Sequence, residues 1–189
     1  MKGLNGRLIL GTVAGLLLLG QTLAATNATN NVTVTIPSVS EIRLTQNSSN
    51  AAVANPAITF APTAAQIISA AEAPINIDPT ATPGFNRVSY LVNRNVNWSV
   101  AVKASGNPSF PAGLSLGDVL LLYSSNDGDG NPAGGSSLNM STSDQTVDSG
   151  NEKTNSFQHT SLGYQLRLTG DEAEGSSSGV VIQFTLTTP

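Results

Sequence analysis

Apolar and polar residues alternate with a period of two along most of the chain. This pattern predicts β-strands that bury one face, because successive side chains of a strand point to opposite sides. The largely apolar run at 118–123 predicts a further strand buried on both faces. The alternating runs are residues 32–36, 41–45, 87–92, 95–104, 162–169 and 180–187, with shorter runs at 57–60 and 74–77.

The residues between these runs predict the connections. A polar pair at Asn93 and Arg94 predicts a hairpin between 87–92 and 95–104, and the polar loop 170–179 predicts a second hairpin before 180–187. Residues 63–73 are alanine-rich, with Thr63 as N-cap and Pro74 as stop, which predicts one short helix. Residues 124–161 predict long loops with one edge strand near 137–140. Many short strands separated by turns indicate an antiparallel β-sandwich.

The beginning of the chain is typical of a secretion signal. Lys2 and Arg7 precede an apolar run at 8–19, and Thr22 and Ala24 supply the small residues expected before a cleavage site. The run is shorter than the roughly 20 residues that span a bilayer, so a retained anchor is the less favoured interpretation. We therefore expect a signal peptide at 1–24, an N-terminal strand at 25–36 and a sandwich domain at 37–189, with the mature protein secreted to the cell surface.

Composition narrows the classes of function. The chain has no cysteine, which excludes disulfides, thiolate catalysis and cysteine-built metal sites. Only 11% of the residues are charged, against about 25% in typical domains. The net charge of −4 becomes more negative when Lys2 and Arg7 are removed. An acidic, weakly charged surface argues against nucleic acid and anionic membranes as partners.

One stretch, 126–131, has the oxygen-rich pattern of a calcium loop. Asp127, Asp129 and Asn131 stand at alternate positions, as in the first half of an EF-hand. The pattern then fails, because Pro132 replaces the required glycine and Leu138 replaces the bidentate glutamate. A solvated turn is the preferred interpretation, and a simpler calcium-stabilised loop at Asp127, Asp129 and Asn131 is the alternative. No other cofactor is expected.

A second motif matches part of a hydrolase signature, but the sequence lacks the structural context that the signature requires. Residues 113–117 read Gly-Leu-Ser-Leu-Gly, and Ser115, Asp144 or Asp148, and His159 follow in the chain order of α/β-hydrolases. That motif requires a strand-to-helix turn above a parallel sheet, and no parallel unit is readable here. We expect Ser115 in a loop, His159 as a single histidine without a zinc site, and no enzymatic activity.

Trp98, the sole tryptophan, shares the alternating face of Val96, Val100 and Val102. This spacing predicts a core residue and not a sugar-binding platform. Aromatic residues make up only 5% of the chain, which also disfavours carbohydrate binding.

From residue 61 onward, APTAAQ leads into VNRNVNWSVAVKAS, a leucine-rich strand, a polar loop and the final YQLRLTG…GVVIQFTLT. This order of features resembles bacterial secreted, immunoglobulin-like surface domains, the group that includes fimbrial and spore-coat-type subunits. The resemblance implies an immunoglobulin-like antiparallel sandwich that polymerises when an N-terminal strand completes a neighbour's sheet. Two departures are the missing cysteine pair and the short polar tail at 25–31.

Two hypotheses of function follow. In the first, the protein is a structural subunit of a surface filament, pilus or coat, a homopolymer in which Val32, Val34 and Ile36 fill pockets of a neighbour. In the second, it is a monomeric secreted binding or adhesion module with a calcium-stabilised loop. The N-terminal strand could also complete its own sheet, and the sequence leaves this choice open.

Overall fold

The computed structural model describes residues 33–46, 49–54, 56–81, 83–125 and 130–189. These residues fall into two units, of which Pro37–Pro189 contains all the named helices and strands. The expected signal peptide, the expected strand residue Val32 and the loop residues Asp127 and Asp129 lie outside the described part.

The larger sheet of the Pro37–Pro189 unit is antiparallel and has the order β1-β3-β8-β5-β6, with β2 also paired to β8. Its longest strand, β8, accepts β3 and β2 one after the other along one edge and β5 along the other. The strands are β1 (Ser40–Thr45), β2 (Ile75–Ile77), β3 (Arg87–Val92), β5 (Val119–Ser125), β6 (Ser136–Asn139) and β8 (Gln158–Leu168).

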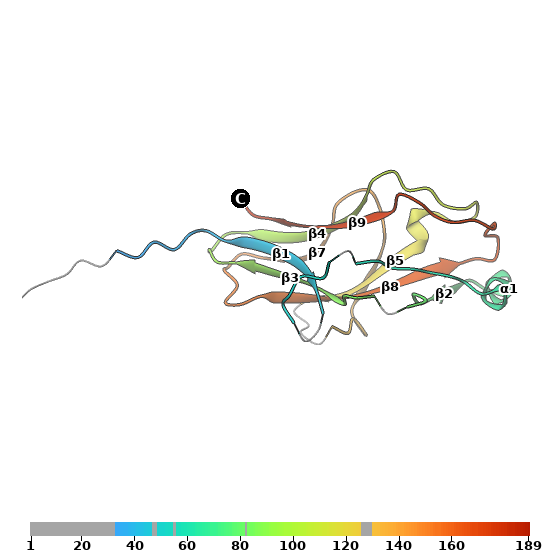
Figure 1. Ribbon diagram of the computed structural model, residues 1–189, viewed down its shortest axis with the longest axis horizontal. Coiled ribbons are helices and arrows are strands. Elements are labelled where there is room, and N and C mark those ends of the chain that lie inside the picture. Colours follow the sequence, from blue (N-terminus) through green and yellow to red (C-terminus); the bar gives the residue numbers. More distant parts are fainter. Residues whose placement is uncertain (1–32, 47–48, 55, 82, 126–129) are drawn as a thin grey trace, which may run out of the picture. The chain divides into compact units, whose positions relative to one another are not determined.

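The smaller sheet has the order β7-β4-β9 and is also antiparallel. It consists of β4 (Trp98–Ser105), β7 (Gln145–Gly150) and β9 (Val181–Thr187). Figure 1 shows the two sheets as layers of one sandwich, with α1 (Ala64–Glu72) beside β2 at one end. The start of β1, the β3–β4 connection and the C-terminus lie at the opposite end (Figure 1). The predicted all-β sandwich with one helix is confirmed.

The core lies between the layers and follows from the alternation. On β4, every second residue from Trp98 is buried, and the Trp98 ring packs on Tyr90 of β3 with 5.1 Å between ring centroids. Trp98 is only 9% exposed, so its predicted role as a core residue is confirmed. The chief buried apolar side chains of the two layers are Val88, Tyr90, Val92, Val100, Val102, Val119, Leu121, Leu162, Tyr164, Leu166 and Leu168.

The helix begins and ends where its caps predict. Thr63 accepts the backbone N–H of Gln66, and the Gln66 side chain accepts the backbone N–H of Thr63, which is a capping box. The helix ends at Glu72, with Ala73 as its C-cap. The edge strand predicted near 137–140 is also present, as β6.

Both predicted hairpins are wrong. β3 belongs to the larger sheet and β4 to the smaller one, so residues 93–97 carry the chain from one layer to the other. In the same way β8 and β9 lie in different sheets. Alternation specifies which face of a strand is buried but not which strand pairs with it, and two strands facing a shared core from opposite layers have the same pattern as a hairpin.

Three local predictions also differ from the structure. Residues 57–60 form no strand, although Ile58 and Phe60 pack against the core. β7 lies inside the stretch predicted to be loops. β5 is not buried on both faces, because Leu120 and Leu122 are only half-buried. Within the described residues, no helix is long and apolar enough to cross a membrane.

Candidate functional site

One side of the sandwich is bordered by two strand edges. β1 is the last strand of the larger sheet and pairs with β3, while β9 is the last strand of the smaller sheet and pairs with β4. Among the strands that the structure describes, neither β1 nor β9 has a partner on its other edge. β1 and β9 approach each other to within 8 Å between Cα atoms, so their outer edges border one side of the sandwich. Near the end of β1 this edge is partly occupied, because the Leu44 carbonyl accepts the Val53 N–H at 2.9 Å.

The inward face of β9 is apolar but incompletely covered. Ile182, Phe184 and Leu186 pair in register with Ala104, Val102 and Val100 of β4 and therefore share their inward face. The three β4 side chains are almost fully buried, whereas the three β9 side chains are only partly buried, although they pack against the core. The core is therefore less completely covered at β9 than at β4.

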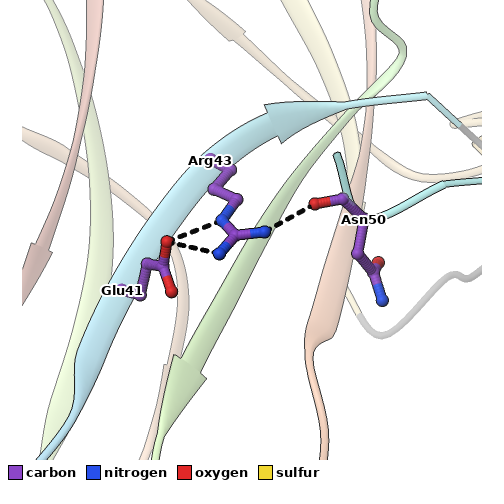
Figure 2. A network of polar contacts seen from close by, with 3 residues as sticks. All are labelled: Glu41, Arg43 and Asn50. Atoms are coloured by element: carbon purple, nitrogen blue, oxygen red, sulfur yellow. Dashed lines mark hydrogen bonds and ion pairs between the residues drawn. The ribbon is translucent and has the colours of Figure 1, made fainter. Parts of the chain in front are cut away.

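The outer face of β1 is fixed by a polar network (Figure 2). The Arg43 guanidinium forms an ion pair with Glu41 at 2.6 Å and donates to the Asn50 carbonyl at 2.9 Å. Its carbon Cζ also lies 4.8 Å from the centre of the Phe157 ring. Because side chains alternate along a strand, pinning Glu41 and Arg43 outside directs Ile42 and Leu44 toward the interior.

A groove of about 160 Å³ lies between the two edges. This volume is close to the roughly 150 Å³ of an apolar cavity that accepts a benzene-sized group, so the groove has room for one or two aliphatic side chains. Its walls are residues of β1 and β9 with one residue of β3: Ile42, Arg43, Leu44, Val88, Ile182 and Phe184. We call this the β1/β9 groove.

The opposite side of the sandwich is closed. The chain passes from β6 directly to β7 there and links the two layers, with the Ala104 N–H donating to the Ser141 carbonyl at 2.7 Å. The Gln145 amide donates to the Asn139 carbonyl at 3.1 Å, and the Lys103 ammonium pairs with Asp144 at 3.1 Å. The β1/β9 side is therefore the side at which the sandwich stays open.

The described part of the N-terminal segment exposes apolar side chains to solvent. We call residues 32–36 the N-terminal arm. Val34 is 76% exposed and Ile36 is 78% exposed, and residues 33–36 belong to no strand. Large aliphatic side chains at alternate positions of an extended segment favour pairing with a sheet edge, which would bury one face.

The calcium prediction is only partly within the described residues. Asn131 is exposed, and its side-chain oxygen accepts the backbone N–H of Ala133 at 3.1 Å, which is an Asx-turn. In the described part of the chain, no three acidic or histidine side chains come together as a metal site would require. The positions of Asp127 and Asp129 are outside that part.

The residues of the hydrolase motif are engaged with other partners. The Ser115 hydroxyl donates to Asp118 at 2.7 Å, at the start of the 3₁₀ turn Leu116–Asp118, so Ser115 lies in a connection as expected. Asp144 pairs with Lys103, and Asp148 accepts the Tyr90 hydroxyl. Tyr90 is fully buried, and burial together with this carboxylate raises its pKa.

His159 belongs to a buried polar cluster on the outer face of β3. Its Nδ1 lies 2.8 Å from the Ser89 hydroxyl, which in turn lies 2.5 Å from the Thr45 hydroxyl. Arg87 donates to Thr45 at 3.2 Å and to the Ser49 carbonyl at 3.1 Å. Burial and the nearby Arg87 cation lower the pKa of His159. Ser89 is fully buried, so this cluster joins β1 to β3 and β8 and gives a substrate no access to the hydroxyl.

Comparison of the chain with protein-family models, with curated proteins and with solved structures gave no match. The proposed function is therefore based on the β1/β9 groove and the N-terminal arm. Sequence reasoning identified the arm, but it missed the groove because the groove depends on which strands end each sheet.

Proposed function

We propose that the protein is an extracellular structural subunit of a surface filament, pilus or coat, which polymerises when the N-terminal arm of one copy enters the β1/β9 groove of the next. The observation that carries this proposal is a groove on the β1/β9 side of the sandwich, five of whose six lining residues are apolar, in a chain that also exposes Val34 and Ile36. Each feature alone exposes apolar surface, and pairing them buries both.

The size of the groove supports side-chain insertion. Val34 and Ile36 stand two residues apart and so project to the same face of an extended arm. Their aliphatic side chains are of the kind and number that about 160 Å³ accepts. Fully burying each one contributes about 1.5–3 kcal/mol.

The separation of the two edges sets how the main chain of the arm would pair. A strand hydrogen-bonded to both β1 and β9 needs about 9.6 Å between them, which is twice the usual strand spacing of about 4.8 Å. The two strands approach to within 8 Å between Cα atoms. The arm therefore adds to one free edge, or the edges separate by about 2 Å or more as it enters.

The test compares Val34→Asp with Thr35→Asp in the chain that lacks residues 1–24. Both changes add one carboxylate to an exposed position of the arm, but only Val34 shares the face of Ile36. We expect filaments from wild type and Thr35→Asp by negative-stain electron microscopy, and monomers from Val34→Asp by size-exclusion chromatography. The thermal stability of the monomer should be unchanged.

Two outcomes would overturn the proposal. A wild-type chain that stays monomeric at every concentration would exclude polymerisation through the arm. A Val34→Asp monomer that unfolds several degrees earlier than wild type would show that the arm completes its own sheet, because a charge in a filled core destabilises the monomer itself.

A further inference from the structure

The residues that join the arm to β1 are held by one side chain. The Val39 N–H donates to the Asn93 side-chain oxygen at 2.8 Å, and the Asn93 amide nitrogen donates to the Pro37 carbonyl at 2.8 Å. The Asn93 backbone N–H also donates to the Val39 carbonyl at 3.1 Å. These contacts continue the β1–β3 pairing past its last registered pair, Ser40 and Val92. We call Asn93 and its bonds to Pro37 and Val39 the Asn93 latch.

Hydrogen bonds on either side of Asn93 hold it in position. Val92, the preceding residue, accepts the Thr154 N–H at 2.8 Å and donates its own N–H to the Thr154 hydroxyl at 3.0 Å. Thr154 is buried. Two residues after Asn93, the Asn95 side chain accepts the Lys153 N–H at 3.0 Å. The connection between β3 and β4 is therefore anchored on the loop before β8, and it presents Asn93 to the start of β1.

The sequence at this junction also permits a different path. If residues 37–39 formed a three-residue hairpin loop, Ile36 would pair with Ser40 and Val34 with Ile42, so the arm would run back along the outer edge of β1 with its apolar face toward the groove of its own chain. Such loops are commonly built on a type I turn, in which proline is favoured at the second position, as Pro37 would be in a turn over 36–39. Pro37 therefore makes such a reversal accessible.

The latch opposes this reversal, since residues 37–39 cannot both extend along Asn93 and form a tight turn. Pro37 has no N–H, so its carbonyl is its only main-chain hydrogen-bonding group, and Asn93 binds it. We propose that Asn93 is a positioning residue that keeps the arm out of its own groove and so makes it available to a second copy of the chain. This inference rests on the proposed function, because it assigns the choice between self and neighbour at the same groove.

The absence of cysteine makes a direct test possible. In a chain with Val34→Cys and Ile182→Cys, a disulfide reports that the arm occupies a groove. A disulfide within one chain leaves a monomer on a non-reducing gel, whereas disulfides between chains give a ladder. The same pair is made with Asn93→Ala, with Asn93→Asp, and with Asn95→Ala as the matched control in the same connection.

We expect a ladder from the chain with Asn93 intact. Asn93→Ala removes two hydrogen bonds, which should raise the ratio of closed monomer to ladder by roughly tenfold. Asn93→Asp keeps the acceptor for Val39 and loses the donor to Pro37, so it should give an intermediate ratio. Asn95→Ala should give the ratio of the parent chain, because its side chain does not contact residues 37–39. A Thr35→Cys and Ile182→Cys pair, which faces the opposite way, should crosslink least.

The outcomes separate the two proposals. The latch proposal is wrong if Asn93→Ala gives the same ratio of ladder to closed monomer as the parent chain, or if Asn95→Ala changes that ratio equally. The polymerisation proposal is unaffected by either result. A closed monomer from the chain with Asn93 intact overturns both, because the arm then fills its own groove. No crosslink in any background shows that the arm enters no groove, which also overturns both.

Discussion

Replacing Val34 by threonine tests the insertion of the arm with almost no change in shape. Valine and threonine are both β-branched and favour extended backbone, so the arm keeps its conformation. The exchange substitutes a hydroxyl for one methyl group. Thr35→Val makes the reverse exchange on the opposite face of the arm and serves as the control.

The expected magnitude follows from the exposure of Val34. The side chain is 76% exposed, so entering a groove would bury about three quarters of the missing methyl, a loss of about 0.6 kcal/mol. A hydroxyl buried without a partner adds about 1–3 kcal/mol. The sum, about 2–4 kcal/mol, corresponds to an association constant lower by about 30-fold to about 700-fold.

The assay is the concentration at which filaments form, measured by sedimentation of the chain without residues 1–24. Because the critical concentration varies inversely with the association constant, Val34→Thr should raise it by about 30-fold to 700-fold. Thr35→Val should leave it within threefold of wild type. The free energy of unfolding of the monomer should change by less than about 0.5 kcal/mol, because Val34 is exposed there. Equal effects of the two variants, or a critical concentration for Val34→Thr within threefold of wild type, would refute insertion of the Val34 face.

Three further predictions concern the sandwich itself. Ile182→Phe adds apolar volume to the open groove, so it should weaken filament formation while the melting temperature of the monomer stays equal or rises; a fall of several degrees would indicate a filled site. Tyr90→Phe removes the hydroxyl that donates to Asp148 and should lower the free energy of unfolding in urea by about 1–3 kcal/mol; a loss below about 0.5 kcal/mol would contradict that bond. Burial and Arg87 lower the pKa of His159 in the folded state, so below about pH 6.5 the unfolded chain binds more protons and stability falls as pH decreases. The urea midpoint at pH 5.5 and 7.5 measures this, and His159→Gln should reduce the difference; an unchanged pH dependence in that variant would rule out His159 as its source.

The elements of the fold were largely predictable because they depend on local pattern. Alternation located β3 at its observed bounds, and the Thr63 and Pro74 signals bracketed the helix. β7 was missed because its residues, Gln145–Gly150, are polar apart from Val147, which is its one buried apolar residue. A strand with one core contact produces almost no periodic signal.

The pairing of the strands was not predictable in the same way. The connection at Asn93 and the loop before β9 both look like hairpins, yet each crosses between the layers. A short polar link serves either purpose, and the choice depends on contacts between residues far apart in sequence, such as Val92 with Thr154. The groove and the latch both follow from these crossings, so neither had a signal in the sequence.

The edge strands on the two sides of the sandwich differ in how polar their residues are. Exposed edge strands invite pairing with other chains, and polar residues are a usual protection. β6 and β7, on the closed side, have the sequences SSLN and QTVDSG, in which one residue of each strand is strongly apolar. β9 has the sequence VIQFTLT, with Val181 exposed and three large apolar side chains only partly buried. Few apolar side chains lie at β6 and β7 and several lie at β9, which supports the proposal that a strand adds at β9 and that the arm, with Val34 and Ile36 exposed, is that strand.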